Sequence, residues 1–418
     1  MGRGAFLPFL TYGSLFRLSR VSWRSGSSVP LASPEASVLW VAADTFFFGS
    51  SARSLGGAED TDVVARKGAA RGQGNTQMTQ SFPLDPLGAG TSSAQVDTYN
   101  AHQASVGTLA AHDSFRHEGF LWSGEDEFLA GTVPFIRQGL EAEQPIMVAV
   151  IAPHIGLLRA AMGSGADQVR FVDMAVLGRN PAQIIPTWRE FVAEHAADGQ
   201  PVRGIGEPIW PGRRPAEVTE CQLYEALLNL AVEPDTPLWL LCPYDVQVLA
   251  PDVITEAQRS HPVLFEDQNH RRSTLYGGPR HAATIFESDL PPVQVAGSHR
   301  TFGREDLQAL RKDVTNHALA AGLSPARSAD LALAVHEVTA NSVKHGSGKR
   351  VLRIWVEHDS LVCEVSDHGR ITDPMIGRKT PERDDEKGRG LWMANHLCDL
   401  VQVRSGHTST TIRIHIWL

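Results

Sequence analysis

The sequence predicts two globular domains behind an N-terminal tail: an α/β domain with a parallel sheet, then an α+β domain. In residues 111–265, apolar runs of strand length alternate with amphipathic helical stretches, as they do in βαβ units. In residues 297–418, a long helical stretch is followed by strands with alternating apolar residues. Residues 266–296 between them are polar and contain prolines, and they are predicted to form a linker with an edge strand.

The composition is that of an ordinary globular protein, and it excludes several classes. Of the 418 residues, 42% are hydrophobic and 20% are charged. The formal net charge of −9 argues against a general nucleic-acid binder, so no direct contact with nucleic acid is expected. No apolar run reaches the length of a membrane-spanning helix. The 4 cysteines have neither zinc-site nor thioredoxin-like spacing and form no disulfide framework, which favours the cytoplasm.

Residues 1–110 are predicted to be a largely disordered tail. Residues 1–77 in particular are rich in glycine and serine and have no sustained period of 2 or 3.6. Such a segment buries too little apolar surface to offset the entropy lost on ordering. We interpret it as a plain extension, or as an upstream stretch translated from an over-long gene model; a targeting or regulatory tail is the alternative.

The elements of the first domain follow from its apolar runs. Strands are predicted at residues 119–122, 146–151, 169–172 and 238–242, and helices at 126–139, 157–162, 186–197 and 219–231. Ligands of open α/β sheets bind at the carboxyl ends of the strands. Glu207, Tyr244 and Asp245 are therefore the candidate residues for a sensed ligand, with His117 near them. Ordinary core packing is the alternative for each of them.

A helix of the second domain carries three polar residues on one line. Ser324 and Pro325 make a good helix start, and the helix is predicted to continue to Lys344. Its buried stripe and its polar line are spaced by three and four residues, which places each set on one face. The stripe consists of Leu331, Val335 and Val338, and the polar line consists of Glu337, Asn341 and His345.

Two further segments are suited to a nucleotide. Asp367 follows a predicted strand, where its carboxylate can accept a hydrogen bond from an adenine amine, and Gly369 lets the backbone approach the base. A glycine-rich segment then opens a helix, whose first N–H groups form an anion site for phosphates. The candidate nucleotide-binding residues are Asn341, Asp367, Gly369, Gly388, Arg389, Gly390, Leu391 and, in the threonine-rich last strand, Thr411.

The order and spacing of these segments resemble the GHKL (Bergerat) ATPase family, which includes sensor histidine kinases and gyrase B. The resemblance implies an α+β sandwich that binds ATP and Mg²⁺. It implies that Asn341 holds the metal, that Asp367 recognises adenine, and that Gly388 and Gly390 close over the phosphates. One departure concerns Ile371, which stands where the family has a third glycine near the adenine.

Within the family, the short segment between Gly369 and Gly388 and the missing phosphoacceptor helix resemble the anti-sigma-factor serine kinases. That resemblance implies that Glu337 is the catalytic base, and that the partners are a sigma factor and an anti-sigma-factor antagonist. A homodimer is left open. Two alternatives remain: a catalytically silent ATP-binding module that sequesters its partner, and an atypical sensor histidine kinase.

The first domain resembles the MEDS sensory domain. The matching phrases are at residues 117–122, 134–140, 203–208, 224–229 and 241–245. The resemblance implies a RecA-like fold that senses a small molecule, whose identity the sequence leaves open. No Gly-Lys-Ser/Thr is present, so P-loop hydrolysis is not expected. Together the two resemblances imply an ATP-dependent signalling regulator, a serine/threonine kinase under the control of a sensory domain.

Overall fold

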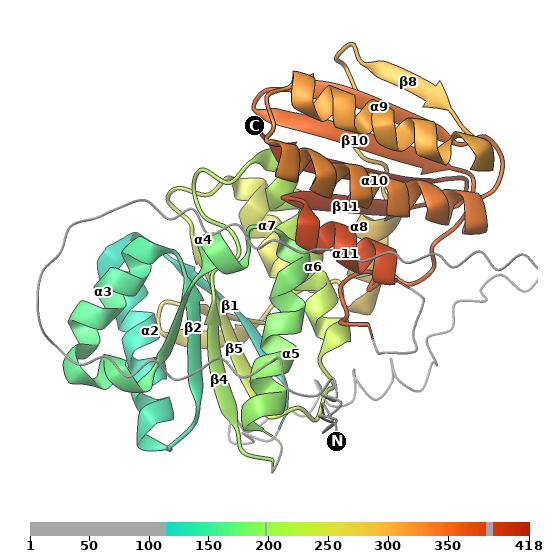
Figure 1. Ribbon diagram of the computed structural model, residues 1–418. Helices are drawn as coiled ribbons and strands as arrows, with labels where there is room; N and C mark the ends of the chain where they lie inside the picture. The colour runs from blue at the N-terminus through green and yellow to red at the C-terminus, as the bar shows by residue number, and fades with distance from the viewer. Residues whose placement is uncertain (1–113, 197–198, 382–387) are drawn as a thin grey trace, which may run out of the picture. The chain divides into compact units, whose positions relative to one another are not determined.

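A mixed sheet of seven strands forms the centre of the first domain (Figure 1). The computed structural model describes residues 114–196, 199–381 and 388–418, and the predicted tail lies outside them. The strands are β1 (Arg116–Trp122), β2 (Ile146–Val150), β3 (Arg170–Asp173), β4 (Val202–Gly206), β5 (Leu238–Asp245), β6 (Val263–Glu266) and β7 (Asn269–Arg272). Their order is β3-β2-β4-β5-β1-β6-β7; all neighbours pair in parallel except β7, which is antiparallel to β6.

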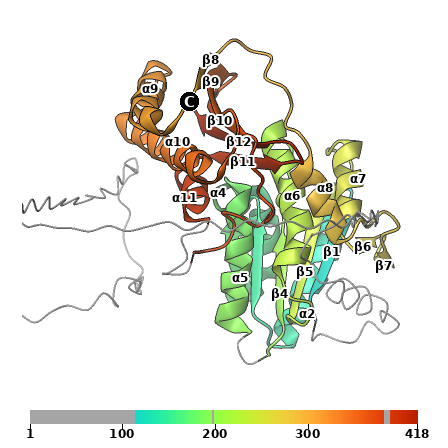
Figure 2. The same cartoon turned by 90° about the vertical axis from the view of Figure 1, so that its right-hand side faces the viewer.

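Helices cover both faces of this sheet (Figures 1 and 2). They are α2 (Gly124–Glu141), α3 (Ala152–Met162), α4 (Met174–Leu177), α5 (Ile184–His195), α6 (Pro215–Ala231), α7 (Pro251–Ser260) and α8 (Pro279–Glu287). Short 3₁₀ turns lie at Gly163–Gln168 and Pro181–Gln183. Phe128 and Ile136 of α2 pack on one side of the sheet, and Trp188 of α5 and Leu227 of α6 pack on the other. Burial of such apolar side chains is the main stabilising contribution of this domain.

The predicted strands and helices of this domain are present, with boundaries shifted by a few residues. Five elements were not predicted: α4, β4, α7, β6 and α8. Helix α8 lies inside residues 266–296, together with β7, which is the edge strand predicted there. The helix forms because an amphipathic stretch buries Ala282 and Phe286 in the core, which the prolines around it had obscured.

An antiparallel sheet with helices on it forms the second domain. Its strands are β8 (Ser298–Thr301), β9 (Val351–Glu357), β10 (Ser360–Asp367), β11 (Leu400–Ser405) and β12 (Thr410–Trp417), in the order β11-β12-β10-β9-β8. The helices are α9 (Leu307–Ala320), α10 (Pro325–His345) and α11 (Arg389–Leu397), and a 3₁₀ turn lies at Arg304–Asp306. Figure 1 shows the three helices beside this sheet, which is the predicted α+β arrangement.

Helix α10 is the element that positions the candidate site, and its sequence explains its form. The Ser324 hydroxyl accepts a hydrogen bond from the Arg327 amide at 3.3 Å, and a proline occupies the first helical position. Three residues of the predicted stripe are at most 1% exposed, because this face packs on the sheet: Leu331, Val335 and Val338. The opposite face is therefore left for polar residues. Among the described residues, no helix is long and apolar enough to cross a membrane.

Candidate functional site

Helix α10 carries Glu337 and Asn341 one turn apart, and both side chains are half-buried. Within the described ranges, neither side chain has a hydrogen-bond or ion-pair partner. His345, the third member of the predicted line, is exposed in the last turn of the helix. The Glu337 carboxylate and the Asn341 amide, on the polar face of α10, are therefore available to bind a ligand.

Asp367 ends strand β10 and is held at the C-terminal end of α10. Its carboxylate accepts hydrogen bonds from the Ser342 hydroxyl at 2.5 Å and from the Gly369 amide at 2.6 Å. A methyl group in place of a hydrogen at Gly346 or Gly369 would lie 2.6 or 2.7 Å from a carboxylate oxygen. Only glycine fits at these two positions, so the backbone approaches Asp367 closely on two sides.

Gly388 opens helix α11, in agreement with the predicted helix start. Its φ of 80° lies in the left-handed region, which glycine adopts without strain. Gly390 and Leu391 are buried in the first turn, whereas Arg389 is exposed. The first N–H groups of a helix have no partner inside the helix and point out of its end. The turn from Gly388 to Leu391 therefore presents backbone donors at the start of α11.

Gly390 brings the two helices together at the candidate site. A methyl group on its Cα would lie 2.9 Å from Asn341 Nδ2 and 3.2 Å from Glu337 Oε2. The missing side chain lets the first turn of α11 approach both polar residues of α10. Ser342, next to Asn341, bonds Asp367. The structure thus gathers the three segments that the sequence analysis singled out separately.

The threonines of β12 are placed by the strand register. Thr410 pairs with Asp367, and its buried hydroxyl donates to the Gly369 carbonyl at 2.8 Å. Thr411 pairs with Ser366 and is half-buried. Successive side chains of a strand point to opposite faces, so Thr410 shares the face of Asp367 and the predicted Thr411 lies on the other face.

The segment between Gly369 and Gly388 carries a buried ion pair. Arg378 is 4% exposed and donates to Glu220 Oε2 at 3.0 Å. The other oxygen of Glu220 accepts from Arg404 of β11 at 2.6 Å. Glu220 belongs to α6, so it joins α6 to strand β11 of the second sheet and to the segment before α11. All of these residues lie in the compact unit Pro86–Leu418. Burial lowers the pKa of Arg378, and the Glu220 carboxylate opposes this effect.

At the carboxyl edge of the first sheet, Glu207 and Asp245 bond different groups. Glu207 Oε2 accepts from the Ile151 amide at 3.0 Å and lies 2.9 Å from His154 Nδ1. Asp245 accepts from the Gln247 amide at 2.9 Å, which closes a local turn. Both residues lie where the sequence predicted polar groups, but no contact joins them in the described part of the chain.

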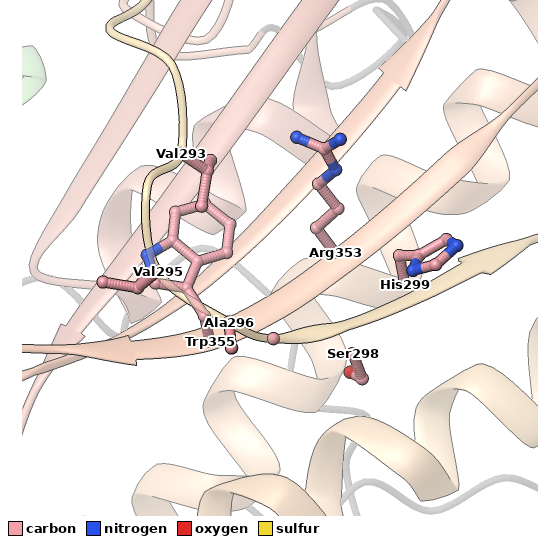
Figure 3. Close-up of a pocket in the computed structure, with 8 residues that line it drawn as sticks. Val293, Val295, Ala296, Ser298, His299, Arg353 and Trp355 are labelled. Atoms are coloured by element: carbon pink, nitrogen blue, oxygen red, sulfur yellow. The ribbon is translucent and has the colours of Figure 1, made fainter.

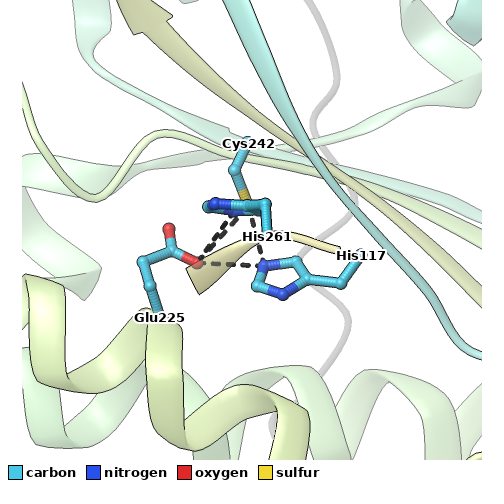
Figure 4. Close-up of side chains that lie close together, drawn as sticks. All are labelled: His117, Glu225, Cys242 and His261. Atoms are coloured by element: carbon cyan, nitrogen blue, oxygen red, sulfur yellow. Dashed lines mark hydrogen bonds and ion pairs between the residues drawn. The ribbon is translucent and has the colours of Figure 1, made fainter. Parts of the chain in front are cut away.

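Tyr244 is buried and bonds Glu225, a residue of α6. Its hydroxyl donates to Glu225 Oε1 at 3.0 Å. The other carboxylate oxygen of Glu225 lies 3.0 Å from His117 Nε2, 3.4 Å from His261 Nε2 and 3.7 Å from Cys242 Sγ (Figure 4). His117, expected near the ligand residues, therefore joins Tyr244 through Glu225 and not Glu207 or Asp245. All five side chains are at most 1% exposed.

Burial governs the ionisation of this cluster. Burial, with the neighbouring His261, lowers the pKa of His117. Burial and the Glu225 charge raise the pKa values of Cys242 and Tyr244 well above their usual range. Burial also works to raise the pKa of Glu225, but the two imidazoles outweigh it and hold that pKa at about 2. The cluster thus contains one carboxylate among a thiol, a phenol and two imidazoles.

A hollow on the second domain contains none of the predicted residues. It has a volume of about 270 Å³ and lies along β8 and β9, between the chain at Val293 and the side chains of Arg353 and Trp355 (Figure 3). Exposed backbone and the edge strand form most of its wall. It gives no support to a second ligand site.

Sequence reasoning missed Thr410, Glu220, Glu225 and His261. For Glu225 a signal was present: it stands in α6 between Tyr224 and a run of apolar residues, where a carboxylate is stable only if it is paired. For Thr410 the choice between adjacent threonines depended on strand register, which a single sequence does not determine. Nothing in the sequence marked Glu220 or His261.

Residues 116–262 match the family described as MEDS, MEthanogen/methylotroph, DcmR Sensory domain. Residues 303–416 match the family described as Histidine kinase-like ATPase domain. No sequence among curated proteins matches the chain.

Two solved structures show some likeness. The RsbU and RsbW domains of Rv1364c from Mycobacterium tuberculosis share 16% identity over 50% of this chain and 49% of that chain, with a TM-score of 0.24. The histidine kinase AdeS from Acinetobacter baumannii shares 11% identity over 30% of this chain and 69% of that chain, with a TM-score of 0.18. The chain thus spans about half the length of the first of these structures.

The two family matches agree with the sheets and the motifs described above. Residues 116–262 are a MEDS sensory domain, and residues 303–416 are a histidine-kinase-like ATPase domain of the GHKL type.

Proposed function

We propose that the ATPase domain binds ATP with Mg²⁺ and is a protein serine/threonine kinase of the anti-sigma-factor type, under the control of the sensory domain. The observation that carries the proposal is the approach of Gly390 to Asn341 and Glu337. This approach supports the proposal because an amide, a carboxylate and the start of a helix lie close together there. Each of these groups serves phosphoryl transfer.

The donors at the site fit the nucleotide and its metal. The side-chain oxygen of Asn341 is a hard ligand of the kind that Mg²⁺ prefers. The N–H groups at Gly388–Leu391 suit phosphate oxygens. Asp367 keeps lone pairs for an adenine amine after its two bonds to Ser342 and Gly369. Three positions where a Cβ would fill the space are glycine: Gly346, Gly369 and Gly390.

Glu337 is the proposed general base. When bound, ATP supplies the phosphoryl group to be transferred. Glu337 takes the proton of the attacking serine hydroxyl, since its carboxylate is unpaired among the described residues and lies one turn from Asn341. Asn341 holds the metal, and the start of α11 keeps the phosphates in position for the hydroxyl.

Sensory control is proposed to pass through two contacts with the ATPase domain. Glu220 of α6 bonds Arg378, in the segment that leads to Gly388. At the other end of α11, the Asn395 carbonyl accepts from Asn180 at 3.0 Å and from Gln183 at 2.9 Å. A shift of α6 or of the Asn180 turn would therefore move the helix whose first turn binds the phosphates.

The proposed target is a serine on an anti-sigma-factor antagonist, with a sigma factor as the second partner. To test this, the full chain is incubated with labelled ATP, Mg²⁺ and candidate antagonists, and the labelled residue is identified. Phosphoserine or phosphothreonine on an antagonist supports the proposal. Phosphohistidine on the chain itself would favour the sensor histidine kinase. Binding of Mg-ATP and of a sigma factor without any transfer would favour the sequestering module.

The nucleotide site is tested separately by titration calorimetry. Asn341→Ala is expected to abolish Mg²⁺-dependent binding of ATP, and Asp367→Asn to weaken recognition of adenine relative to guanine. Asn316→Ala makes the same amide-to-methyl change at an exposed position of α9 and serves as the control. If Asn341→Ala and Asp367→Asn both bind Mg-ATP as the parent does, the proposed site is wrong.

A further inference from the structure

Four buried side chains of the sensory domain point their donor atoms at one position (Figure 4). They are His117, Glu225, Cys242 and His261, and their donor atoms all lie within 4.8 Å of one another. We propose that these four residues bind a divalent transition-metal ion, Zn²⁺ by the chemistry of the set. The proposal does not depend on the ATPase site.

Four of the six distances between the donors suit a tetrahedral ion. Zinc binds nitrogen and oxygen at about 2.0–2.2 Å and sulfur at about 2.3 Å, so the edges of its tetrahedron are roughly 3.3–3.7 Å long. Glu225 Oε2 lies 3.0 Å from His117 Nε2, 3.4 Å from His261 Nε2 and 3.7 Å from Cys242 Sγ. Cys242 Sγ lies 3.4 Å from His117 Nε2. These edges lie within a few tenths of an ångström of the tetrahedral values.

The hydrogen bonds of His117 free its Nε2 for a metal. Nδ1 lies 3.0 Å from Asn229 Oδ1. The amide orientation of Asn229 is set, because its Nδ2 donates to the carbonyls of Glu225 and Ser260 at 3.2 and 2.8 Å. Asn229 Oδ1 is therefore an acceptor, and His117 Nδ1 must carry the proton. The neutral ring then presents a lone pair at Nε2, as metal-binding histidines do.

His261 is arranged in the same way. Its Nδ1 lies 2.7 Å from the Ala257 carbonyl, which can only accept, so Nδ1 carries the proton. Its Nε2 is buried and has no hydrogen-bond partner in the described structure, although Glu225 Oε2 is 3.4 Å away. Neutral imidazole lone pairs aimed at a carboxylate repel it, so the metal-free cluster must hold a proton between Nε2 and Glu225, and a metal ion can take the place of that proton.

The fold makes room for this arrangement. His117 and Cys242 stand on neighbouring strands, β1 and β5, and Glu225 stands on the helix that covers them. Gly119 pairs with Cys242, and a methyl group on it would lie 3.1 Å from His261 Cγ. The absence of a side chain at Gly119 lets the His261 ring reach the other three residues. Tyr244 bonds the second oxygen of Glu225 and orients that carboxylate.

The donor set selects the kind of ion. One thiolate, two imidazoles and one carboxylate favour a borderline-soft ion such as Zn²⁺ over Mg²⁺ or Ca²⁺, which prefer oxygen ligands alone. Four protein ligands complete a tetrahedron, and all four are at most 1% exposed. A closed site of this kind holds a resident ion and does not exchange substrate.

The first experiment measures metal content. The full chain is incubated with Zn²⁺ alone, desalted and analysed by mass spectrometry for bound metal; about one equivalent per chain is expected. Cys242→Ser and His261→Ala are expected to lose it. Cys221→Ser is the matched control, because Cys221 is equally buried and lies on α6, with its thiol bonded to the Pro208 carbonyl. A folded parent without zinc, or a Cys242→Ser variant that holds as much zinc as the parent, would overturn the proposal.

A second measurement remains decisive if a variant fails to fold. The parent is loaded with Co²⁺ in place of Zn²⁺, and its visible and near-ultraviolet spectrum is recorded. Strong tetrahedral d–d bands with a thiolate charge-transfer band are expected, and their absence would overturn the proposal. Asn229→Ala, which removes the partner of His117 Nδ1, is expected to weaken metal affinity about 10- to 100-fold while leaving the bands in place. An unchanged affinity would count against the role given to Asn229.

Discussion

The polar side chains of the two candidate sites differ in their exposure to solvent and in their pairing. In the ATPase domain, Glu337 and Asn341 are half-buried, lie beside Gly390 and have no partner among the described residues. In the sensory domain, Glu225 and the groups around it are closed off from solvent. An open site with unpaired donors suits a ligand that comes and goes at each turnover. A closed site with converging donors suits an ion that stays, so a glutamate would serve a different purpose in each place.

The largest expected effect concerns the open site. Glu337→Gln is expected to lower phosphoryl transfer by roughly two to four orders of magnitude, the usual contribution of a general base, because the amide cannot accept the hydroxyl proton. ATP affinity, measured by calorimetry, is expected to remain. Glu305→Gln changes an exposed carboxylate of the same domain and is the control. If the parent and Glu337→Gln had equal turnover, Glu337 would not be the general base.

The next effect concerns Glu220, the carboxylate of the sensory domain that accepts hydrogen bonds from the ATPase domain. Glu220→Ala leaves the buried guanidinium groups of Arg378 and Arg404 without their partner, and removing one member of a buried pair costs about 3–5 kcal/mol. Urea denaturation measures the free energy of unfolding. Glu233→Ala, at an exposed position just after α6, is expected to change it by at most about 0.5 kcal/mol. A small loss for Glu220→Ala would mean that the two arginines find other partners.

A pair of glycine substitutions sharpens the contrast between the sites. Gly390→Ala places a methyl group 2.9 Å from Asn341 Nδ2 and is expected to weaken ATP binding by about 1–3 kcal/mol, without changing zinc content. Gly119→Ala places one 3.1 Å from His261 Cγ and is expected to weaken zinc binding by a similar amount, without changing ATP affinity. Calorimetry with each ligand tests both variants. If either variant impaired both ligands equally, the sites would not be independent.

The smallest effect, taken over one pH unit, concerns His415, a buried histidine with no carboxylate partner among the described residues. Burial, together with Arg413 and Arg214, lowers the pKa of His415 to about 3, and its Nε2 faces Gln402 at 3.1 Å. Because the unfolded chain takes up this proton near pH 6.5 and the folded chain does not, stability falls as the pH drops from about 6.5 towards 3, by at most about 1.4 kcal/mol per pH unit. In the His415→Gln variant, the free energy of unfolding, measured as a function of pH, is expected to lack this contribution. If the free energies of unfolding of parent and variant changed equally with pH, His415 would not be the source of this pH dependence.

The residues proposed for the open site could be selected from the sequence because they lie in local segments. Glu337 and Asn341 lie on one helix four positions apart, and Gly388 and Gly390 mark a helix start, so their placement follows from helix geometry alone. The position of Asp367 could be predicted because it ends a strand. The choice of Thr411 over Thr410 depended on pairing between strands, where a shift of one residue exchanges the faces of the sheet.

The closed cluster could not be predicted in the same way. Its four residues come from β1, α6, β5 and the turn after α7, and the smallest separation between them along the chain is that of Glu225 and Cys242. The cysteines do not show the spacing of a zinc site, because the cluster contains only one cysteine and its other three residues come from distant segments. Tyr244 was identified as polar at a strand end, but its partner on α6 became evident only from the packing of that helix.

The burial of the cysteines has a consequence for the chemical durability of the chain. All four thiols are buried, and burial alone raises the pKa of Cys363 to about 12. Since the thiolate is the species that attacks alkylating agents, peroxide and other disulfides, the folded protein has no ready nucleophile of this kind at neutral pH. Covalent modification of sulfur would therefore begin only after a domain has opened. The rate of thiol labelling becomes a direct measure of how often each domain unfolds.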